Sequence, residues 1–302
     1  MKRIKVIACV LAASLLAGVF AGCSKTTKIT TENFIKACEK LKLDEIDIGD
    51  DFDNDDIEDG VYAYADEDYI EDYPDDVETF LSDLRLDDVI DVDDITSFAM
   101  AVKCTGLDTI EDIREPDDIA DVELDGAFAF QMQLSESGYA EDFMDYVDDM
   151  LDLANIDTKD LTNKEFFVSK NEGYFRFHID VAKFAKIVLE NDDIMDFVDE
   201  VSDADDFEDA LNSLTGDVSV SVEINGTNIF VIVGGSVNSK PTVYDSFIKA
   251  FGVSNNPAKV PMNNDVVTDT LDELVDDYGR YVFGMTAMVG VTVAATAFQL
   301  RI

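Results

Sequence analysis

Apolar side chains along this chain follow two different periods, and the change from one to the other separates expected strands from expected helices. Alternation of apolar and polar positions, typical of strands, occurs at residues 61–65, 95–104, 126–134, 166–169, 174–179, 217–224 and 228–235. Asn225-Gly226 lies between the last two stretches. This dipeptide suits the positive φ angles of a two-residue turn, so we expect a hairpin there.

A period near 3.6 residues marks the expected helices. They cover residues 31–43, a segment that Pro74 opens and whose apolar face extends to Leu84, then 139–154, 181–190 with a partner piece at 194–201, 243–251 and 266–278. Thr30 and Thr31 carry capping hydroxyls before the first helix. Most of these helices pair one apolar stripe with an acidic face, so we expect packing of the stripe to hold them in place.

The order strand, strand, helix recurs three times, at 95–154, 166–201 and 217–251. Residue identities do not repeat at a fixed period, so the recurrence is architectural and does not indicate a duplication. Hairpins separated by amphipathic helices favour the α+β class, with an antiparallel sheet built from strand-strand-helix units and the helices packed on one face.

Composition along the chain predicts five parts. Residues 1–22 form an expected signal peptide, and 23–29 form a lipidated cysteine with a polar tether. An acidic α+β region at 30–115 and a central α+β region at 122–253 follow, separated near the acidic stretch 108–121 that contains Pro116. Residues 254–302 comprise a linker, an acidic helix and an apolar segment.

The first 23 residues carry targeting information. Three cations, Lys2, Arg3 and Lys5, precede an apolar run, and Ala21-Gly22 precede Cys23. This layout is that of a secretory signal segment. The segment resembles the signal peptide of a bacterial lipoprotein precursor, which implies that a diacylglyceryl group and palmitate are attached at Cys23. The resemblance implies an extracytoplasmic protein held at the cell membrane by this lipid; an ordinary secretory signal is the alternative.

Charge is the most unusual feature of the composition. The chain has 67 acidic residues against 22 Lys and Arg, for a formal net charge of −45. Such a surface repels nucleic acid and anionic lipid headgroups, and it favours a basic protein or cations as partners. A plain role in solubility remains the alternative. Oligomeric state does not follow from charge.

The acidic stretch from Asp47 to Gly60 invites comparison with a calcium loop, which needs Gly at its sixth position and an acid at its twelfth. Counted from Asp51, Asp56 and Tyr62 occupy these positions. Counted from Asp55, Gly60 fits, but Ile57 stands where a ligand is required. The motif fails in both registers, so we expect an acidic loop over 44–59 and assign no metal ligand.

Catalytic chemistry finds little support. His178 is the only histidine, so the usual zinc sites are excluded, and we expect it to be a structural or surface residue. No Gly-x-Ser-x-Gly sequence is present, and Gly234-Gly235-Ser236 ends a strand without the Gly-Lys-Ser/Thr of a phosphate loop. We therefore expect no catalytic residue, no cofactor and no enzyme activity.

Two cysteines, Cys38 and Cys104, fall on apolar faces of an expected helix and an expected strand. Both suit small core residues, although an exported protein permits a disulfide between them. The run 281–300 has no charged residue and is long enough to span a bilayer, but its alternation also suits a buried strand.

Three functions remain open. We favour a lipid-anchored extracytoplasmic binding or interaction protein with an acidic surface. A hydrolase of cell-wall material or glycans that uses carboxylates, and a membrane-complex subunit anchored through 281–300, are the alternatives.

Overall fold

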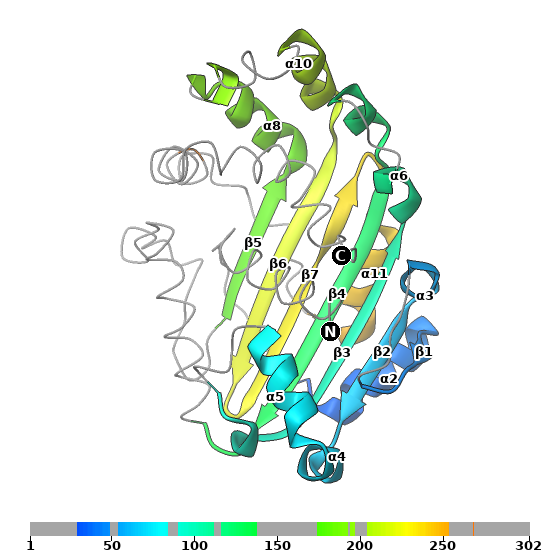
Figure 1. Ribbon diagram of the computed structural model, residues 1–302, viewed down its shortest axis with the longest axis vertical. Coiled ribbons are helices and arrows are strands. Elements are labelled where there is room, and N and C mark those ends of the chain that lie inside the picture. The colour runs from blue at the N-terminus through cyan, green and yellow to red at the C-terminus, as the bar shows by residue number, and fades with distance from the viewer. Residues whose placement is uncertain are drawn as a thin grey trace.

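The computed structural model describes residues 29–48, 54–83, 90–111, 116–137, 174–192, 194–196, 204–253 and Thr268. These residues form an α+β fold with one seven-stranded sheet, in the order β1-β2-β3-β4-β7-β6-β5 (Figure 1). All neighbouring strands are antiparallel except β1 and β2, which are parallel. The expected α+β class with a mostly antiparallel sheet is therefore confirmed.

The strands are β1 (Asp44–Glu45), β2 (Val61–Ala65), β3 (Ile95–Thr105), β4 (Leu124–Leu134), β5 (Tyr174–Asp180), β6 (Gly216–Asn225) and β7 (Asn228–Val237). The helices are α2 (Thr31–Leu41), α3 (Asn54–Asp59), α4 (Glu67–Asp72), α5 (Pro74–Asp83), α6 (Leu107–Glu111), α8 (Val181–Leu189), α10 (Ala204–Ser213) and α11 (Thr242–Phe251), with 3-10 turns η1 (Val92–Asp94) and η2 (Pro116–Asp121). Strands β2 to β7 and helices α2, α5, α8 and α11 fall at the positions expected from their periodicity.

Two helices, α2 and α11, pack against one face of the sheet, which we call the helix face. In Figure 1 they lie behind the strands. The Phe34 and Phe251 rings lie 4.7 Å apart between centroids, and both contact the ring of Phe230 on β7. Burying each such ring contributes about 1.5–3 kcal/mol. Small side chains, Ala99, Ala101, Ala127 and Ala129, line the sheet beneath them, which lets the helices approach closely.

The hairpin of β6 and β7 is confirmed, and Gly226 in its turn has a φ of 62°. At its far end Asn238 also adopts a positive φ of 49°, which Asn tolerates better than most residues. Its side-chain amide donates to the carbonyls of Ala120 and Val122, and its Oδ1 accepts from the backbone N–H of Thr215. Asn238 therefore joins η2 to the ends of both hairpin strands.

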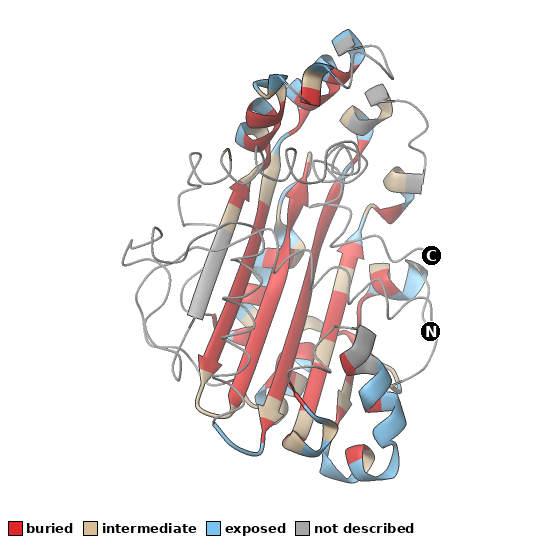
Figure 2. Ribbon diagram, turned by 60° about the vertical axis from the view of Figure 1, so that its left-hand side comes forward, coloured by how far each residue is buried: buried red, intermediate tan, exposed pale blue. Residues whose placement is uncertain are grey.

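The opposite face of the sheet is apolar from β2 to β6. One row of register partners runs through Val61, Val102, Phe128, Val233 and Val220, and all five residues are buried. Figure 2 shows the central strands mostly in the colour of buried residues. Strands buried on both faces are consistent with the density of Val, Phe and Ile in their sequences.

The two cysteines lie on different faces. Cys38 belongs to the helix-face core, whereas Cys104 occupies a β3 position of the opposite parity to Ala99 and Ala101. Both are buried and free. The prediction of small core residues is confirmed, and the sheet separates the two thiols, so they form no disulfide.

The acidic stretch 44–59 differs from the loop expected there. Its described part contains strand β1 and helix α3. The buried side chain of Ile57 packs α3 against the rest of the fold. The helix ends before Gly60, whose positive φ of 92° is typical of a residue that follows a helix. Helices α4 and α10 were not expected either, because their sequences are rich in acids and their apolar faces are short. The buried apolar residues are Ile70 on α4, and Phe207, Ala210 and Leu211 on α10.

The expected boundary near 108–121 falls between β3 and β4, which pair along their length. Strands from both expected regions thus join one sheet, and the division into regions stays a prediction. Several expectations lie outside the described residues: the signal segment with Cys23, the helices at 139–154 and 266–278, the strand at 166–169, and the apolar run 281–300.

Candidate functional site

A group of exposed carboxylates covers two consecutive helices, α4 and α5, and we call it the acidic surface. It comprises Glu67, Asp68, Glu71 and Asp72 on α4, and Asp75, Asp76 and Glu78 on α5. Both helices appear largely exposed in Figure 2, at the end of the sheet where β2 stops. Residues 54–83 contain no Lys or Arg, so no cation from this segment neutralises the surface.

Local interactions explain why these acidic sequences form helices. Asp66 is the N-cap of α4, and its side chain accepts a hydrogen bond from the backbone N–H of Tyr69 at 3.0 Å. Carboxylates in the first turns of α4 and α5 lie near the positive ends of the helix dipoles. Pro74 suits the start of α5, because N–H groups in the first turn of a helix have no intrahelical acceptor and proline has no N–H. Each helix also buries an apolar side chain, Ile70 on α4 and Val77 on α5.

Two tyrosines lie within the acidic surface. Tyr73, the residue between α4 and α5, has 53% of its surface exposed. The rings of Tyr69 and Tyr73 lie 4.9 Å apart, and the Tyr69 hydroxyl donates to the carbonyl of Ile48. Tyr69 thereby holds Tyr73 against the helix. The result is an aromatic ring presented to solvent among carboxylates.

Lysines that form contacts within the described residues do so away from the acidic surface. Lys103 on β3 donates to the carbonyl of Asp59 at the end of α3, across 2.7 Å. The ion pairs that the described residues form at Glu32 with Lys36 and at Asp180 with Lys183 belong to α2 and to the start of α8. Within the described part of the chain, no ion pair therefore reduces the charge of the acidic surface.

His178, the only histidine of the chain, lies on β5 beside β6. Its Nε2–H donates to Asp217 Oδ1 at 2.6 Å, and 11% of the His178 side chain is exposed. Ser219 is the register partner of His178, but its hydroxyl forms no hydrogen bond to the imidazole and is buried. The three side chains lack the linked hydrogen bonds of a nucleophile, a base and an orienting acid.

Gly234-Gly235-Ser236 lies inside β7, which continues to Val237. A side chain at Gly234 would meet the ring of Tyr244 at 2.5 Å, so this glycine lets α11 pack closely on the sheet. The role of this segment is thus in packing, and its backbone pairs with β4 and β6 instead of forming a loop.

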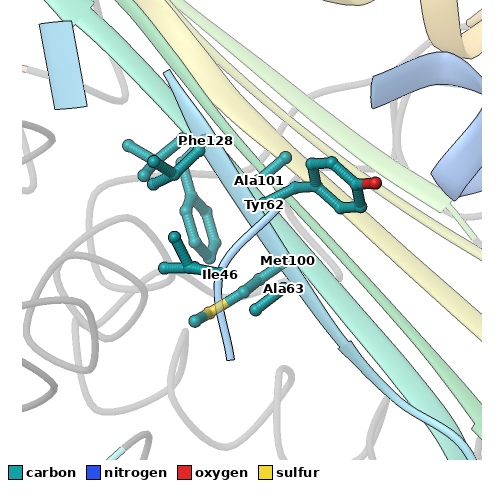
Figure 3. A pocket seen from close by; sticks show the side chains of 8 residues that line it. Ile46, Tyr62, Ala63, Met100, Ala101 and Phe128 are labelled. Atoms are coloured by element: carbon teal, nitrogen blue, oxygen red, sulfur yellow. The ribbon is translucent and has the colours of Figure 1, made fainter. Parts of the chain in front are cut away.

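An apolar hollow with a cavity volume of about 10 Å³ lies at the edge of the sheet near β1 and β2. Figure 3 shows Ile46, Met100, Phe128 and Ala63 around it, while the ring of Tyr62 points away. The Tyr62 hydroxyl donates to Glu45 at 2.8 Å, and burial raises the pKa of this phenol. The hollow is smaller than the roughly 300–1,000 Å³ of typical ligand pockets, so we assign no ligand to it.

Two features are absent from the described residues. Within them, no group of three or more His, Cys, Asp or Glu side chains could hold a metal ion. No helix in the same part of the chain is long and apolar enough to cross a membrane.

Comparisons with protein-family models, with curated proteins and with solved structures found no match to this chain. Function must therefore be argued from its own residues. The high acid content was evident in the sequence, but neither α4 nor the exposure of Tyr73 was expected. In the sequence, the spacing of four residues between Tyr69 and Tyr73 was the signal for this feature, because residues four apart are neighbours on a helix surface.

Proposed function

We propose that this protein is a non-enzymatic, extracytoplasmic binding module that is lipid-anchored to the cell membrane at Cys23 and that captures a basic partner on its acidic surface. The observation that carries the proposal is the exposed ring of Tyr73 among the carboxylates of α4 and α5, in a segment without Lys or Arg. Aromatic rings attract Lys and Arg side chains through cation–π contacts of about 0.5–1 kcal/mol at exposed sites.

The chemistry of the surface favours a Lys- or Arg-rich segment over nucleic acid or an anionic membrane. Seven carboxylates repel phosphates and attract cationic side chains. Individual exposed ion pairs contribute only about 0–1 kcal/mol, so several must act together with the tyrosine to give useful affinity. We also propose that the sheet is built from strand-strand-helix units, an architectural recurrence without duplication of sequence, with the amphipathic helices packed on one face.

Binding of a fluorescent peptide of ten alternating Lys and Arg residues tests this function, with the full-length chain purified in mild detergent. Capture should weaken steeply between low salt and 150 mM salt, because exposed charges are screened over about 8 Å at that ionic strength. The variant Glu71→Gln, Asp72→Asn, Asp75→Asn should bind several-fold more weakly, and Tyr73→Ala should weaken binding further.

The matched control removes three exposed carboxylates from α10 through Asp206→Asn, Glu208→Gln, Asp209→Asn. This variant has the same change in net charge and should bind nearly as well as the wild type. Equal losses in both triple variants would show that net charge alone attracts the peptide. Binding that ignores salt, or unchanged binding by Tyr73→Ala, would contradict the proposed surface.

A further inference from the structure

The described fold begins at a buried residue on the helix face. Ile29 is 3% exposed and belongs to the same apolar cluster as Phe34 of α2 and Phe251 of α11. It follows Cys23 by six positions, and α2 starts two residues after it. An extended chain spans at most about 3.3–3.6 Å per residue, so this tether reaches no further than about 22 Å. A lipid at Cys23 would therefore keep α2 and the helix face close to the bilayer.

Lysines outnumber acids around this entry point, in contrast to the chain as a whole. Residues 24–43 contain five lysines and two acids. Three of these lysines are exposed on α2 and at its C-cap, and one more is exposed in the last turn of α11, which packs beside α2. We call these four residues the lysine surface: Lys36, Lys40, Lys42 and Lys249.

Acids on the same two helices reduce this positive charge but do not reverse it. Glu32 pairs with Lys36, and Glu39 and Asp245 are exposed. The tether, α2 with its C-cap, and α11 together hold six lysines and three acids. Helices α4 and α5 hold eight acids and no Lys or Arg. The charge of the protein is therefore unevenly distributed, and the expected lipid is attached at its more positive part.

The lysine surface and the acidic surface lie on opposite sides of the sheet. In Figure 1, α2 and α11 lie behind the strands and α5 lies in front of them. Ile70 of α4 and Val77 of α5 are buried outside the helix-face cluster. Packed layers of secondary structure lie about 10 Å apart, so about 20 Å separates the two helix layers. Because physiological salt screens exposed charges over about 8 Å, the acidic surface hardly repels anions on the lysine side.

We propose that the lysine surface lies against the anionic headgroups of phospholipids and that it turns the acidic surface away from the membrane. This inference rests on the lipid anchor of the proposed function and extends it, because it specifies which side of the domain meets the bilayer. Lysines are attracted to an anionic membrane within about a Debye length, and the tether holds α2 near that range. The reverse orientation would place the eight acids of α4 and α5 against negative headgroups.

Lysine footprinting on vesicles tests the orientation. The full-length chain is reconstituted from mild detergent into vesicles of neutral phosphatidylcholine, or of phosphatidylcholine mixed with phosphatidylglycerol, and is acylated with an uncharged reagent before peptide mapping. Lys40 and Lys249 should react about threefold or more slowly on the vesicles with phosphatidylglycerol. Lys186 is exposed on α8, which packs on β5 and β6. Its reactivity should differ by less than about 1.5-fold, because it lies beyond the screening length.

A pair of double variants assigns the effect to the lysine surface. Lys40→Gln, Lys42→Gln should make Lys249 as reactive on phosphatidylglycerol as on phosphatidylcholine. The matched control is Lys183→Gln, Lys186→Gln, which removes the same charge from exposed positions on α8 and should leave Lys249 protected. Equal reactivity of Lys40 and Lys249 in wild type on the two lipids would overturn the proposal. Equal effects of the two double variants would also overturn it.

Mass spectrometry of the purified chain detects the lipid at Cys23 separately from the orientation. A chain without this lipid would refute the anchor of the proposed function. A maleimide phospholipid coupled to Cys23 in a Cys9→Ser chain, in which Cys38 and Cys104 are buried, would then supply the tether for the same footprint. The two failures are distinguishable, because one is read as a mass and the other as lysine reactivity.

Discussion

Gln131 donates a hydrogen bond from its Nε2 to Asn228 Oδ1 at 2.9 Å, and both side chains are buried on the helix face. The Gln131 Oε1 atom accepts from the hydroxyl of Thr31, at 2.7 Å, and Thr31 lies 2.7 Å from Ser97 Oγ. A single amide therefore links β4 to β7 and to the first residue of α2. Such buried networks are costly to break in part, because the remaining members lose their partners.

Gln131→Ala should destabilise the protein by about 1–3 kcal/mol, since it leaves the Asn228 carbonyl oxygen without its donor and Thr31 without its acceptor. Urea unfolding would show this as a lower midpoint. Gln133 is partly exposed, and its Nε2 donates to the carbonyl of Thr227. Gln133→Ala should therefore destabilise the protein less than Gln131→Ala. Equal losses at the two positions would argue against a special role of the buried network.

Gly234→Ala should also destabilise the fold, by about 1–3 kcal/mol or more. An added Cβ would lie 2.5 Å from both the Gly126 carbonyl oxygen and the Tyr244 ring, and the backbone oxygen has little freedom to move. Gly226→Ala is the comparison, because nothing lies within 4 Å of its Cβ and only its φ of 62° opposes the change. That strain costs about 1–2 kcal/mol. A thermal melt in which Gly226→Ala is the more damaging change would contradict the packing argument.

The stability contributed by Asp180, the N-cap of α8, should depend on pH. Burial acts to raise the pKa of Asp180, but hydrogen bonds from the Lys183 side chain and backbone N–H outweigh burial and hold the pKa below its ordinary value. Because the folded pKa is the lower one, the contribution is full above the unfolded value of about 4 and is lost as pH falls through the folded value.

Asp180→Ala should therefore cost about 0.5–2 kcal/mol at pH 7, as for other N-caps, and less near pH 3. Denaturant unfolding at both pH values measures the difference. Asp180→Asn, which keeps a cap acceptor without the charge, should show a smaller cost and little change with pH. A pH-independent cost of Asp180→Ala would show that the ionised form has no special role.

Cys38 and Cys104 should resist alkylation in the folded protein. Burial raises the pKa of Cys38 to about 12 and raises the pKa of Cys104 as well, so little thiolate exists at pH 8. Iodoacetamide labelling read by peptide mapping should find both unmodified in the folded chain and modified in urea. Thr79→Cys, on the exposed side of α5, provides a reactive reference. Rapid native labelling of Cys38 or Cys104 would contradict their burial.

Local pattern predicted most described strands and four of the helices, because periodicity reports which side chains are buried. Val61–Ala65 was predicted to the residue, and the hairpin turn at Asn225-Gly226 was confirmed. The helices α3 and α4 were not expected, because caps and single buried residues such as Ile57 and Ile70 hold them instead of a long apolar stripe. Propensity alone is a weak guide for helices of six residues.

The candidate sites were less accessible to sequence reasoning. Acid content suggested basic partners or cations, but it did not distinguish one acidic stretch from another. The exposure of Tyr73 depends on how α4 meets α5, and the pairing of Asp125 with Ser236 depends on strand order. Nothing local indicates that residues about 110 apart in sequence are neighbours.

The sequence by itself determined the α+β class, the positions of most elements and the excess of negative charge, because each follows from composition or short-range period. Only the tertiary structure decided that β4 pairs with β7 and that the two cysteines lie on opposite faces. Those relationships arise from long-range strand pairing, which buries apolar side chains on both faces of one sheet and brings distant polar groups together.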